Sequence, residues 1–312
     1  MGTPLNPLLR KQINQPLDVG VKAINGLLTC AKGQRVGIMA GTGVGKSVLL
    51  GMIARNTEAE INVIALIGER GREVKGFIEE NLGSEGLKRS IVVAAASDQP
   101  PLVRLRGAFI ATTIAEYFRD QGKDVLLMMD SISRFALAQR EIGLSIGEPP
   151  TTKGYPPSTF SLIPKLLERA GTAEGNGSIT GLYTVLTEGD DLNEPISDAV
   201  RGILDGHVVL DRAIAERGRY PAVNVLRSIS RTMPACNTPE QNALVNRARQ
   251  MLATYEDMAE LIRLGAYKRG TDPKIDEAIQ FNPALEAFLA QDIEEATVFE
   301  ACYQRLSEIF AS

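Results

Sequence analysis

The sequence is poor in the side chains that build metal centres and disulfide frameworks. Its 312 residues include one histidine, three widely separated cysteines and no tryptophan. A single imidazole cannot form a histidine-rich metal site, and three cysteines without a CxxC pair exclude a thiolate-rich site and suit a reducing compartment. We therefore expect His207, within Gly206-His207-Val208-Val209-Leu210, to be an ordinary strand residue.

Long hydrophobic runs and a surplus of basic residues are also absent. No apolar stretch approaches the roughly 20 residues that a membrane span needs, and the N-terminus lacks a signal-peptide pattern, which predicts a cytosolic protein. The chain has 34 Lys and Arg against 38 Asp and Glu, a net charge of −4, and residues 238–312 contain 13 acids and 7 bases. Because a sequence-independent nucleic-acid binder usually carries a basic domain, we expect no nucleic-acid partner.

Short apolar runs rich in β-branched residues recur along the first two thirds of the chain. Hydrophobic residues make up 44% and charged residues 23%, the balance of a globular protein with a core. Continuous apolar strands are typical of a sheet that helices cover on both faces, and helical segments such as 102–121 lie between the runs. This alternation predicts an α/β fold with a mostly parallel sheet. The expected strands are 35–40, 61–67, 91–96, 125–129, 179–186 and 208–210.

The pattern becomes helical after Pro239. Thr238 suits the N-cap and Pro239 the first helical position, and apolar side chains between residues 244 and 262 share one helical face. We expect Asn282-Pro283 to open a second helix and residues 299–310 to form a last one.

These patterns divide the chain into three parts. We expect an extended entry segment at residues 1–30, an α/β domain at 31–238 and an α-helical C-terminal domain at 239–312. The proline-rich segment 147–157 is too long and irregular for a simple connection, which is typical of a functional loop.

The strongest chemical signal is a glycine-rich segment between a strand and a helix. Its sequence is Ala40-Gly41-Thr42-Gly43-Val44-Gly45-Lys46-Ser47-Val48, with alanine where the usual pattern has its first glycine. Glycines let successive backbone N–H groups turn inward at a helix N-terminus, which forms an anion nest. Lys46 is then expected to reach the β- and γ-phosphates and Ser47 to ligate Mg²⁺. The alternative is a tight turn with a surface lysine.

Acidic residues follow two of the expected strands. Asp130 ends the run Val125-Leu126-Leu127-Met128-Met129, at the edge where ligands gather in open α/β sheets, and we expect it to hold Mg²⁺ through water. Gly68-Glu69-Arg70-Gly71-Arg72-Glu73 follows another strand. Glu69 is a candidate base for the attacking water, Arg70 a candidate partner of the γ-phosphate, and Glu73 a candidate ligand through water. Spacing alone fits a solvated charge cluster equally well.

Several separate motifs together resemble one family. They are Gly68-Glu69-Arg70-Gly71-Arg72-Glu73, Asp130-Ser131-Ile132-Ser133-Arg134-Phe135, Tyr220-Pro221-Ala222-Val223 and Ala138-Gln139-Arg140-Glu141-Ile142-Gly143. The chain resembles the catalytic subunits of rotary ATP synthases and, more closely, their homohexameric relatives, the flagellar and type III secretion export ATPases. The resemblance covers nearly the whole chain and implies a RecA-like P-loop core.

The resemblance also implies roles for individual residues. Lys46 and Ser47 match the P-loop lysine and metal ligand, Asp130 the Walker B aspartate, and Glu69 the glutamate that polarises the attacking water. Arg70 and Arg134 match arginines around the γ-phosphate. Three further residues match by motif: Tyr220 the aromatic that stacks on adenine, Phe288 a second wall of that pocket, and Arg231 the arginine finger that enters a neighbouring subunit's site.

The family implies Mg-dependent ATP hydrolysis that energises protein export. Its partners are a homohexameric ring, a coiled-coil stalk and regulators, export chaperones and substrates, and the export gate, at the cytoplasmic side of the inner membrane. The family's N-terminal β-barrel has no counterpart in this sequence, so we expect this chain to be monomeric or weakly associating.

Three other functions are alternatives to the export ATPase. An ATP synthase catalytic subunit would carry an acidic stalk-contact motif, whereas Arg263-Leu264-Gly265-Ala266-Tyr267-Lys268-Arg269-Gly270 stands in that region. A Rho-like RNA translocase would carry an RNA-binding domain. A non-hydrolysing regulatory subunit would lack the glutamate at position 69. These differences favour the export ATPase.

Overall fold

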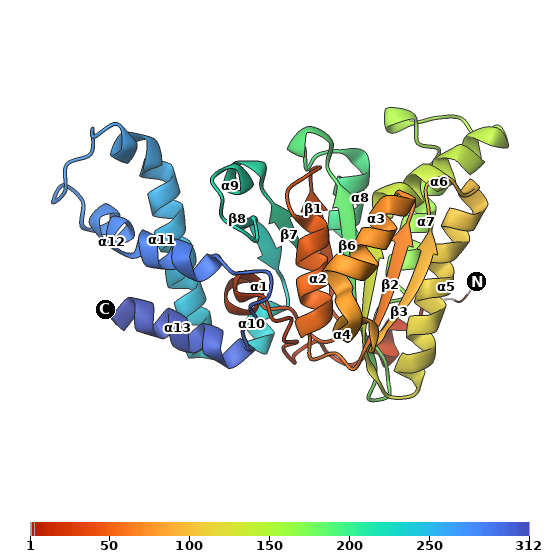
Figure 1. The fold of residues 1–312 in the computed structure, drawn as a ribbon, viewed down its shortest axis with the longest axis horizontal. Coiled ribbons are helices and arrows are strands. Elements are labelled where there is room, and N and C mark those ends of the chain that lie inside the picture. Colours follow the sequence, from red (N-terminus) through yellow and green to blue (C-terminus); the bar gives the residue numbers. More distant parts are fainter. Residues whose placement is uncertain (1, 3, 312) are drawn as a thin grey trace.

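A mixed, mostly parallel sheet forms the centre of the molecule (Figure 1), seen in a computed structural model that describes residues 2 and 4–311. The strand order is β3-β2-β4-β6-β1-β7-β8, with the short β5 paired to β6. All pairs are parallel except β5 with β6 and β7 with β8, which confirms the predicted α/β fold. The strands are β1 (Arg35–Ala40), β2 (Ile61–Ile67), β3 (Ser90–Ala95), β4 (Asp124–Asp130), β5 (Gly171–Thr172), β6 (Ser178–Leu186), β7 (Gly206–Leu210) and β8 (Val223–Ser230).

Strand β8 is absent from the strands that the sequence predicts. It alternates between buried and exposed positions near its end and carries polar side chains such as Asn224 and Arg227, because it lies at the sheet edge and runs antiparallel to β7. An edge strand has one neighbour and a wetter face, so it lacks the continuous apolar run that revealed the inner strands.

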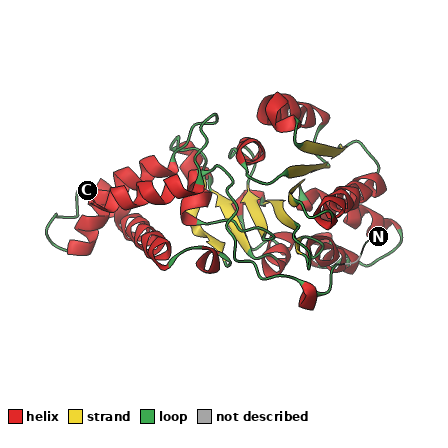
Figure 2. Cartoon of the chain, turned by 90° about the horizontal axis from the view of Figure 1, so that it is seen from below, coloured by secondary structure: helices red, strands yellow, loops and turns green. Residues whose placement is uncertain are grey.

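Helices cover both faces of the sheet, and Figure 2 shows them flanking the strands. Among the described residues, none of these helices is both long and apolar enough to cross a membrane. The α-helices are α1 (Lys22–Leu27), α2 (Lys46–Asn56), α3 (Gly71–Gly76), α4 (Gly83–Leu87), α5 (Pro101–Asp120), α6 (Ile132–Ser145), α7 (Pro157–Leu167), α8 (Pro195–Ile203), α9 (Arg212–Glu216), α10 (Met233–Cys236), α11 (Pro239–Arg263), α12 (Pro273–Leu289) and α13 (Phe299–Ala311). A π-helix, η2 (Phe77–Leu82), follows α3, and three short 3₁₀ turns are η1 (Pro7–Leu9), η3 (Thr152–Gly154) and η4 (Glu188–Asp190).

Two hydrophobic cores lie on the two sides of the sheet. Successive side chains of a strand point to opposite faces, so Ile38 of β1 joins one core and Met39 the other. The first core includes side chains of α1, α2 and the C-terminal helices α11–α13, whereas the second includes those of α5, α6, α7 and α8. The helix of the glycine-rich segment, α2, therefore shares a core with the C-terminal helices.

The C-terminal helices lie together at the β8 end of the sheet (Figure 1). Helix α11 begins at Pro239 as predicted, with a capping box in which Thr238 Oγ1 accepts from Gln241 N and Gln241 Oε1 accepts from Thr238 N. The expected helix start at Asn282-Pro283 is wrong. Helix α12 begins at Pro273, where Asp272 caps it, and continues through Pro283. The stronger start signal is thus the capping aspartate followed by proline.

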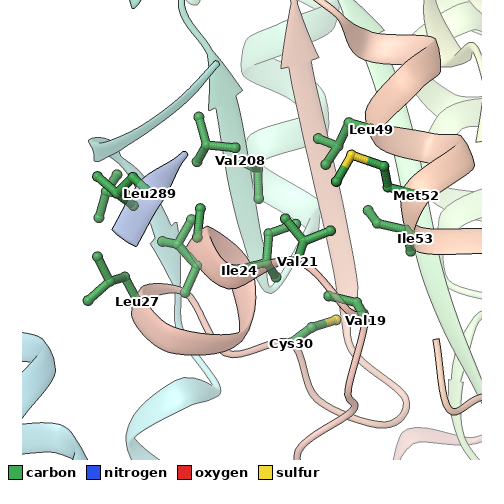
Figure 3. Close-up of a cluster of buried hydrophobic side chains, with 14 of the residues drawn as sticks. Val19, Val21, Ile24, Leu27, Cys30, Leu49, Met52, Ile53, Val208 and Leu289 are labelled. Carbon is green, nitrogen blue, oxygen red and sulfur yellow. The ribbon is translucent and has the colours of Figure 1, made fainter. Parts of the chain in front are cut away.

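The entry segment is not extended throughout, contrary to expectation. Residues 22–27 form α1, and residues 17–31 are almost entirely buried. Figure 3 shows Val21, Ile24 and Leu27 among side chains of α2, β7 and α12. The short helix is stabilised by this burial, since six residues are too few for a helix that is stable by itself.

Candidate functional site

The carboxyl ends of the parallel strands bring the candidate residues to one edge of the sheet. Ala40 at the end of β1 pairs with Leu186 of β6 and Leu210 of β7. Leu66 of β2 pairs with Asp130 at the end of β4. The glycine-rich segment follows Ala40, and Glu69 follows β2 by two residues, so both lie where β4 delivers Asp130. This is the edge at which open α/β sheets bind ligands.

The glycine-rich segment forms a tight turn that leads into α2. Gly43 and Gly45 have φ angles of 80° and 90°, a backbone conformation that L side chains rarely adopt, and helix α2 begins at Lys46. The turn therefore points the start of α2 toward the sheet edge. Backbone N–H groups at such a helix start, together with the lysine, form a site for phosphate.

Lys46 lies between two buried carboxylates. Its Nζ forms an ion pair with Asp130 Oδ1 and lies 3.8 Å from Glu69 Oε1. Thr184 of β6 donates a hydrogen bond to the same Asp130 oxygen at 2.7 Å. Asp130 is thus fixed from two sides, and the three charged groups converge as the sequence led us to expect.

Glu69 is a buried carboxyl group with a raised pKa. It is 8% exposed, and its Oε1 has no hydrogen-bond partner among the described residues. Burial, and then the negative charge of Asp130, raise the pKa of Glu69 to about 7, and a hydrogen bond with Glu73 adds to this, against the opposing charges of Lys46 and Arg134. The same hydrogen bond lowers the pKa of Glu73 below its usual value. A carboxylate with a pKa near neutrality suits a base or a water-orienting group.

Two arginines lie near Glu69 in different surroundings. Arg134 of α6 is half-buried, and its Cβ lies 2.7 Å from the position that a Cβ on Gly68 would take, so the side chain starts against the Glu69 turn. Arg70 has 77% of its side chain exposed and lies 3.4 Å from Glu73. Arg134 is therefore already held beside Glu69, whereas Arg70 extends into solvent.

The Tyr220 ring lies beside the glycine-rich turn at residues 41–48, which we call the phosphate-binding turn. A Cβ on Gly45 would be 3.5 Å from two Tyr220 ring carbons, and Tyr220 is 47% exposed, so a ring face is open to a ligand. Phe288 lacks such an open face. It is 4% exposed, and its Cζ lies 2.7 Å from the Cβ position of Gly26 in α1. The expected second adenine wall at Phe288 is thus not supported, because this side of α12 packs into the core.

Arg231 lies near the amino ends of the parallel strands, whereas the phosphate-binding turn lies at their carboxyl ends. It follows β8, whose last residue Ser230 pairs with Gly206, the first residue of β7. The length of β7, five residues and about 16 Å at 3.3 Å per residue, separates the two edges. The exposed Arg231 therefore cannot reach the phosphate-binding turn of its own chain.

The structure adds residues that the sequence pattern did not reveal. Arg212 of α9 donates to the Thr42 carbonyl at 3.1 Å and to Asp190 Oδ2 at 3.0 Å, which fixes the turn from outside. A cavity of about 470 Å³ opens beside the turn, with Arg134, Arg140 and Arg212 in its lining. Neither Thr184 nor Arg212 lies in a recognisable motif, so no sequence signal would have identified them.

The oxygen donors at this edge suit a hard cation. Asp130, Glu73 and the Ser47 hydroxyl are the candidate ligands, and hard cations prefer oxygen. In the part of the chain that the structure describes, no group of three or more His, Cys, Asp or Glu side chains could hold a metal ion alone. A magnesium ion usually keeps several waters and substrate phosphates in its coordination shell, so it needs few protein ligands.

Known families match two consecutive parts of the chain. Residues 20–230 match the nucleotide-binding domain of the ATP synthase alpha/beta family, and residues 237–308 match the type III secretion EscN ATPase C-terminal domain. The flagellum-specific ATP synthase of Bacillus subtilis strain 168 is 59% identical over 307 residues, which cover 98% of this chain and 70% of that protein. That of Salmonella typhimurium is 56% identical over 308 residues, 98% of this chain and 68% of that protein.

Solved structures agree with these relatives. The assembled ATPase EscN of the enteropathogenic E. coli type III secretion system is 50% identical with a TM-score of 0.95, over 99% of this chain and 74% of that one. EscN in complex with its central stalk EscO is 49% identical with a TM-score of 0.92, over the same shares. The chain therefore belongs to the ATP synthase alpha/beta family, in the branch of the flagellum-specific ATP synthases and type III secretion ATPases.

Proposed function

We propose that this chain hydrolyses Mg-ATP in a ring that energises flagellar or type III protein export. The observation that carries the proposal is the convergence of Lys46, Asp130 and Glu69 beside a phosphate-binding turn, within a family of nucleotide-using ATPases. Glu69 would orient the attacking water and accept its proton, as its burial and its pKa of about 7 favour.

The remaining residues would bind and orient the nucleotide. The N–H groups of residues 41–48 would hold the phosphates, Lys46 would neutralise their charge, and Tyr220 would stack on the base. Ser47 would ligate Mg²⁺, and Asp130 and Glu73 would hold its water shell; when bound, the ion neutralises phosphate oxygens. Arg134 and Arg70 would stabilise charge on the γ-phosphate.

Assembly would complete the site. Arg231 would act in a neighbouring copy, because its place at the far sheet edge excludes its own site. Structures of EscN include the assembled ATPase and its complex with a central stalk. We propose that this chain likewise forms a homohexamer around a coiled-coil stalk, at the export gate on the membrane. The ring would act on export chaperones and their substrates. In it, residues 31–238 would form the ATPase domain and 239–312 a C-terminal domain.

Replacing Glu69 with Gln tests the chemical assignment. Loss of a positioned general base typically lowers the rate by about 10²–10⁴, whereas the affinity for nucleotide comes from the phosphate-binding turn, the metal and the contact with adenine. We expect Glu69→Gln to lose hydrolysis by that factor while binding Mg-ADP with an unchanged Kd, measured by single-turnover hydrolysis and calorimetric titration.

The matched control is Glu80→Gln, an exposed carboxylate outside the site, which should keep both properties. A Glu69→Gln enzyme that keeps more than about a tenth of the wild-type rate would show that Glu69 is not the base.

A further inference from the structure

Gln291 is a buried side chain whose hydrogen bonds join the α12–α13 connection to the segment at the start of α1. It follows α12 and is 6% exposed. Its Oε1 accepts from Lys22 N, at the start of α1, at 2.8 Å. Its Nε2 donates to Gly20 O at 2.7 Å and to Glu295 O at 2.8 Å. The amide thus satisfies an α1 N-terminal N–H that has no side-chain cap, and it uses both of its own donors.

The backbone of the same residue holds Tyr220. Gln291 N donates to Tyr220 O at 2.9 Å, and the Tyr220 ring lies 3.5 Å from the Cβ position of Gly45. Because the side chain fixes the place of its own backbone, it also fixes the carbonyl of the residue that presents a ring to the nucleotide site. The base-binding side of the site is therefore tied to the C-terminal helices.

The segment that Gln291 contacts is itself anchored to α2. We call residues 18–22 the strap. Asp18 O accepts from Glu58 N at 3.0 Å and from Thr57 Oγ1 at 3.1 Å, at the end of α2, and Asp18 Oδ2 accepts from Phe299 N, at the start of α13, at 2.8 Å. Lys22 Nζ lies 2.5 Å from Glu295 Oε1. Gln291 therefore rests on a fixed frame, and Figure 3 shows neighbouring Leu289 packed beside α1.

We infer that Gln291 is a positioning residue for the nucleotide base: its side-chain amide locks the strap to the α12–α13 connection and thereby holds Tyr220 over the phosphate-binding turn. The inference rests on the proposed nucleotide site. Gln291 acts through Tyr220, so its loss weakens the part of the affinity that comes from the base and leaves the part that comes from the phosphates.

Two probes separate these parts. Mg-ADP carries the base, whereas magnesium tripolyphosphate binds through phosphate alone. Gln291→Met keeps the length of the side chain and removes its hydrogen bonds, each of which contributes modestly, so we expect Mg-ADP to bind about three- to tenfold more weakly. The Kd of magnesium tripolyphosphate should be unchanged, and both are measured by isothermal titration calorimetry.

A double-mutant cycle identifies the path of the effect. Tyr220→Ala should weaken the binding of Mg-ADP but not that of magnesium tripolyphosphate. Adding Gln291→Met to Tyr220→Ala should weaken Mg-ADP binding no further. Gln280→Ala, exposed on α12, is the matched control and should match wild type. Three results would each overturn the inference: equal weakening of the binding of both probes in Gln291→Met, a further loss of Mg-ADP affinity in the double variant, or an unchanged Mg-ADP Kd in Gln291→Met. If the wild-type chain binds neither probe, the proposed function fails instead. Thermal melting establishes that every variant is folded.

Discussion

At the residue scale, two carboxyl groups four residues apart, Glu69 and Glu73, influence each other's pKa. Burial and the negative charge of Asp130 raise the pKa of Glu69, and a hydrogen bond between Glu69 and Glu73 raises it further and lowers the pKa of Glu73. With a pKa of about 7, the Glu69 carboxyl is partly protonated near neutral pH. The buried member, Glu69, keeps the proton because burial disfavours its charge more.

This coupling predicts a pH dependence. Only ionised Glu69 can accept a proton, so kcat/KM should rise with pH through about 7. In Glu73→Gln, a carboxylate that can only accept is replaced by a neutral amide that can also donate to ionised Glu69. The Glu69 pKa should therefore fall, and the rising limb should move to lower pH. Steady-state hydrolysis across this pH range measures the shift. Glu80→Gln should leave the limb in place, and an unmoved limb in Glu73→Gln would show that Glu73 does not set the Glu69 pKa.

At the scale of elements, helix ends decide how the C-terminal part is attached to the sheet. The capping box at Thr238 starts α11 just after β8 and α10, and Asp272 caps α12. Each cap satisfies backbone N–H groups that a helix start leaves unpaired. The start of α11 is therefore set by local hydrogen bonds at Thr238, whereas its packing joins the core that α11 shares with α2.

Removing the cap should destabilise the protein. Thr238→Ala loses the hydroxyl that accepts from Gln241 N at 3.2 Å, and such substitutions cost about 1 kcal/mol. We expect a lower urea midpoint by circular dichroism. Thr238→Ser keeps a capping hydroxyl and should retain most of the stability. Equal midpoints for the alanine and serine variants would show that the hydroxyl contributes nothing.

At the scale of the whole molecule, the sheet separates two functional ends. The phosphate-binding turn lies at one edge, and Arg231 lies at the other because β8 runs antiparallel to β7. Under the proposed assembly, one chain would present an incomplete nucleotide site and, about the length of a strand away, the arginine that would complete a neighbour's site.

This arrangement predicts that activity depends on assembly. An arginine finger contributes on the order of 10³–10⁵ in rate, so hydrolysis per chain should rise with protein concentration. A mixture of Arg231→Ala and Lys46→Ala chains should regain activity, because an intact turn can then meet an intact arginine.

The control replaces the first chain with the double variant Lys46→Ala, Arg231→Ala, which leaves no intact turn and should give no recovery. Concentration-independent hydrolysis, with no recovery when mixed assemblies form, would show that Arg231 does not act between chains.

The sequence alone determined the features that depend on neighbouring residues. The continuous apolar runs predicted β1 and β2 to the residue, because strands buried on both faces are apolar at nearly every position. The glycine-rich turn and the Thr238 cap could likewise be predicted from the sequence, since each depends on interactions within a few residues. For the same reason, the prediction at Pro283 was wrong: the local sequence favours a helix start there, but α12 begins at Pro273 and continues past Pro283.

Only the tertiary structure decided which distant residues meet. The strand order β2-β4-β6 brings Glu69, Asp130 and Thr184 together, and no spacing encodes that order. The rotation of α12 turns Phe288 into the core, while the chain beyond the helix delivers Gln291 to Tyr220. Such contacts arise from the packing of whole elements, whose free energy is summed over many side chains far apart in the sequence, so no single segment contains the information.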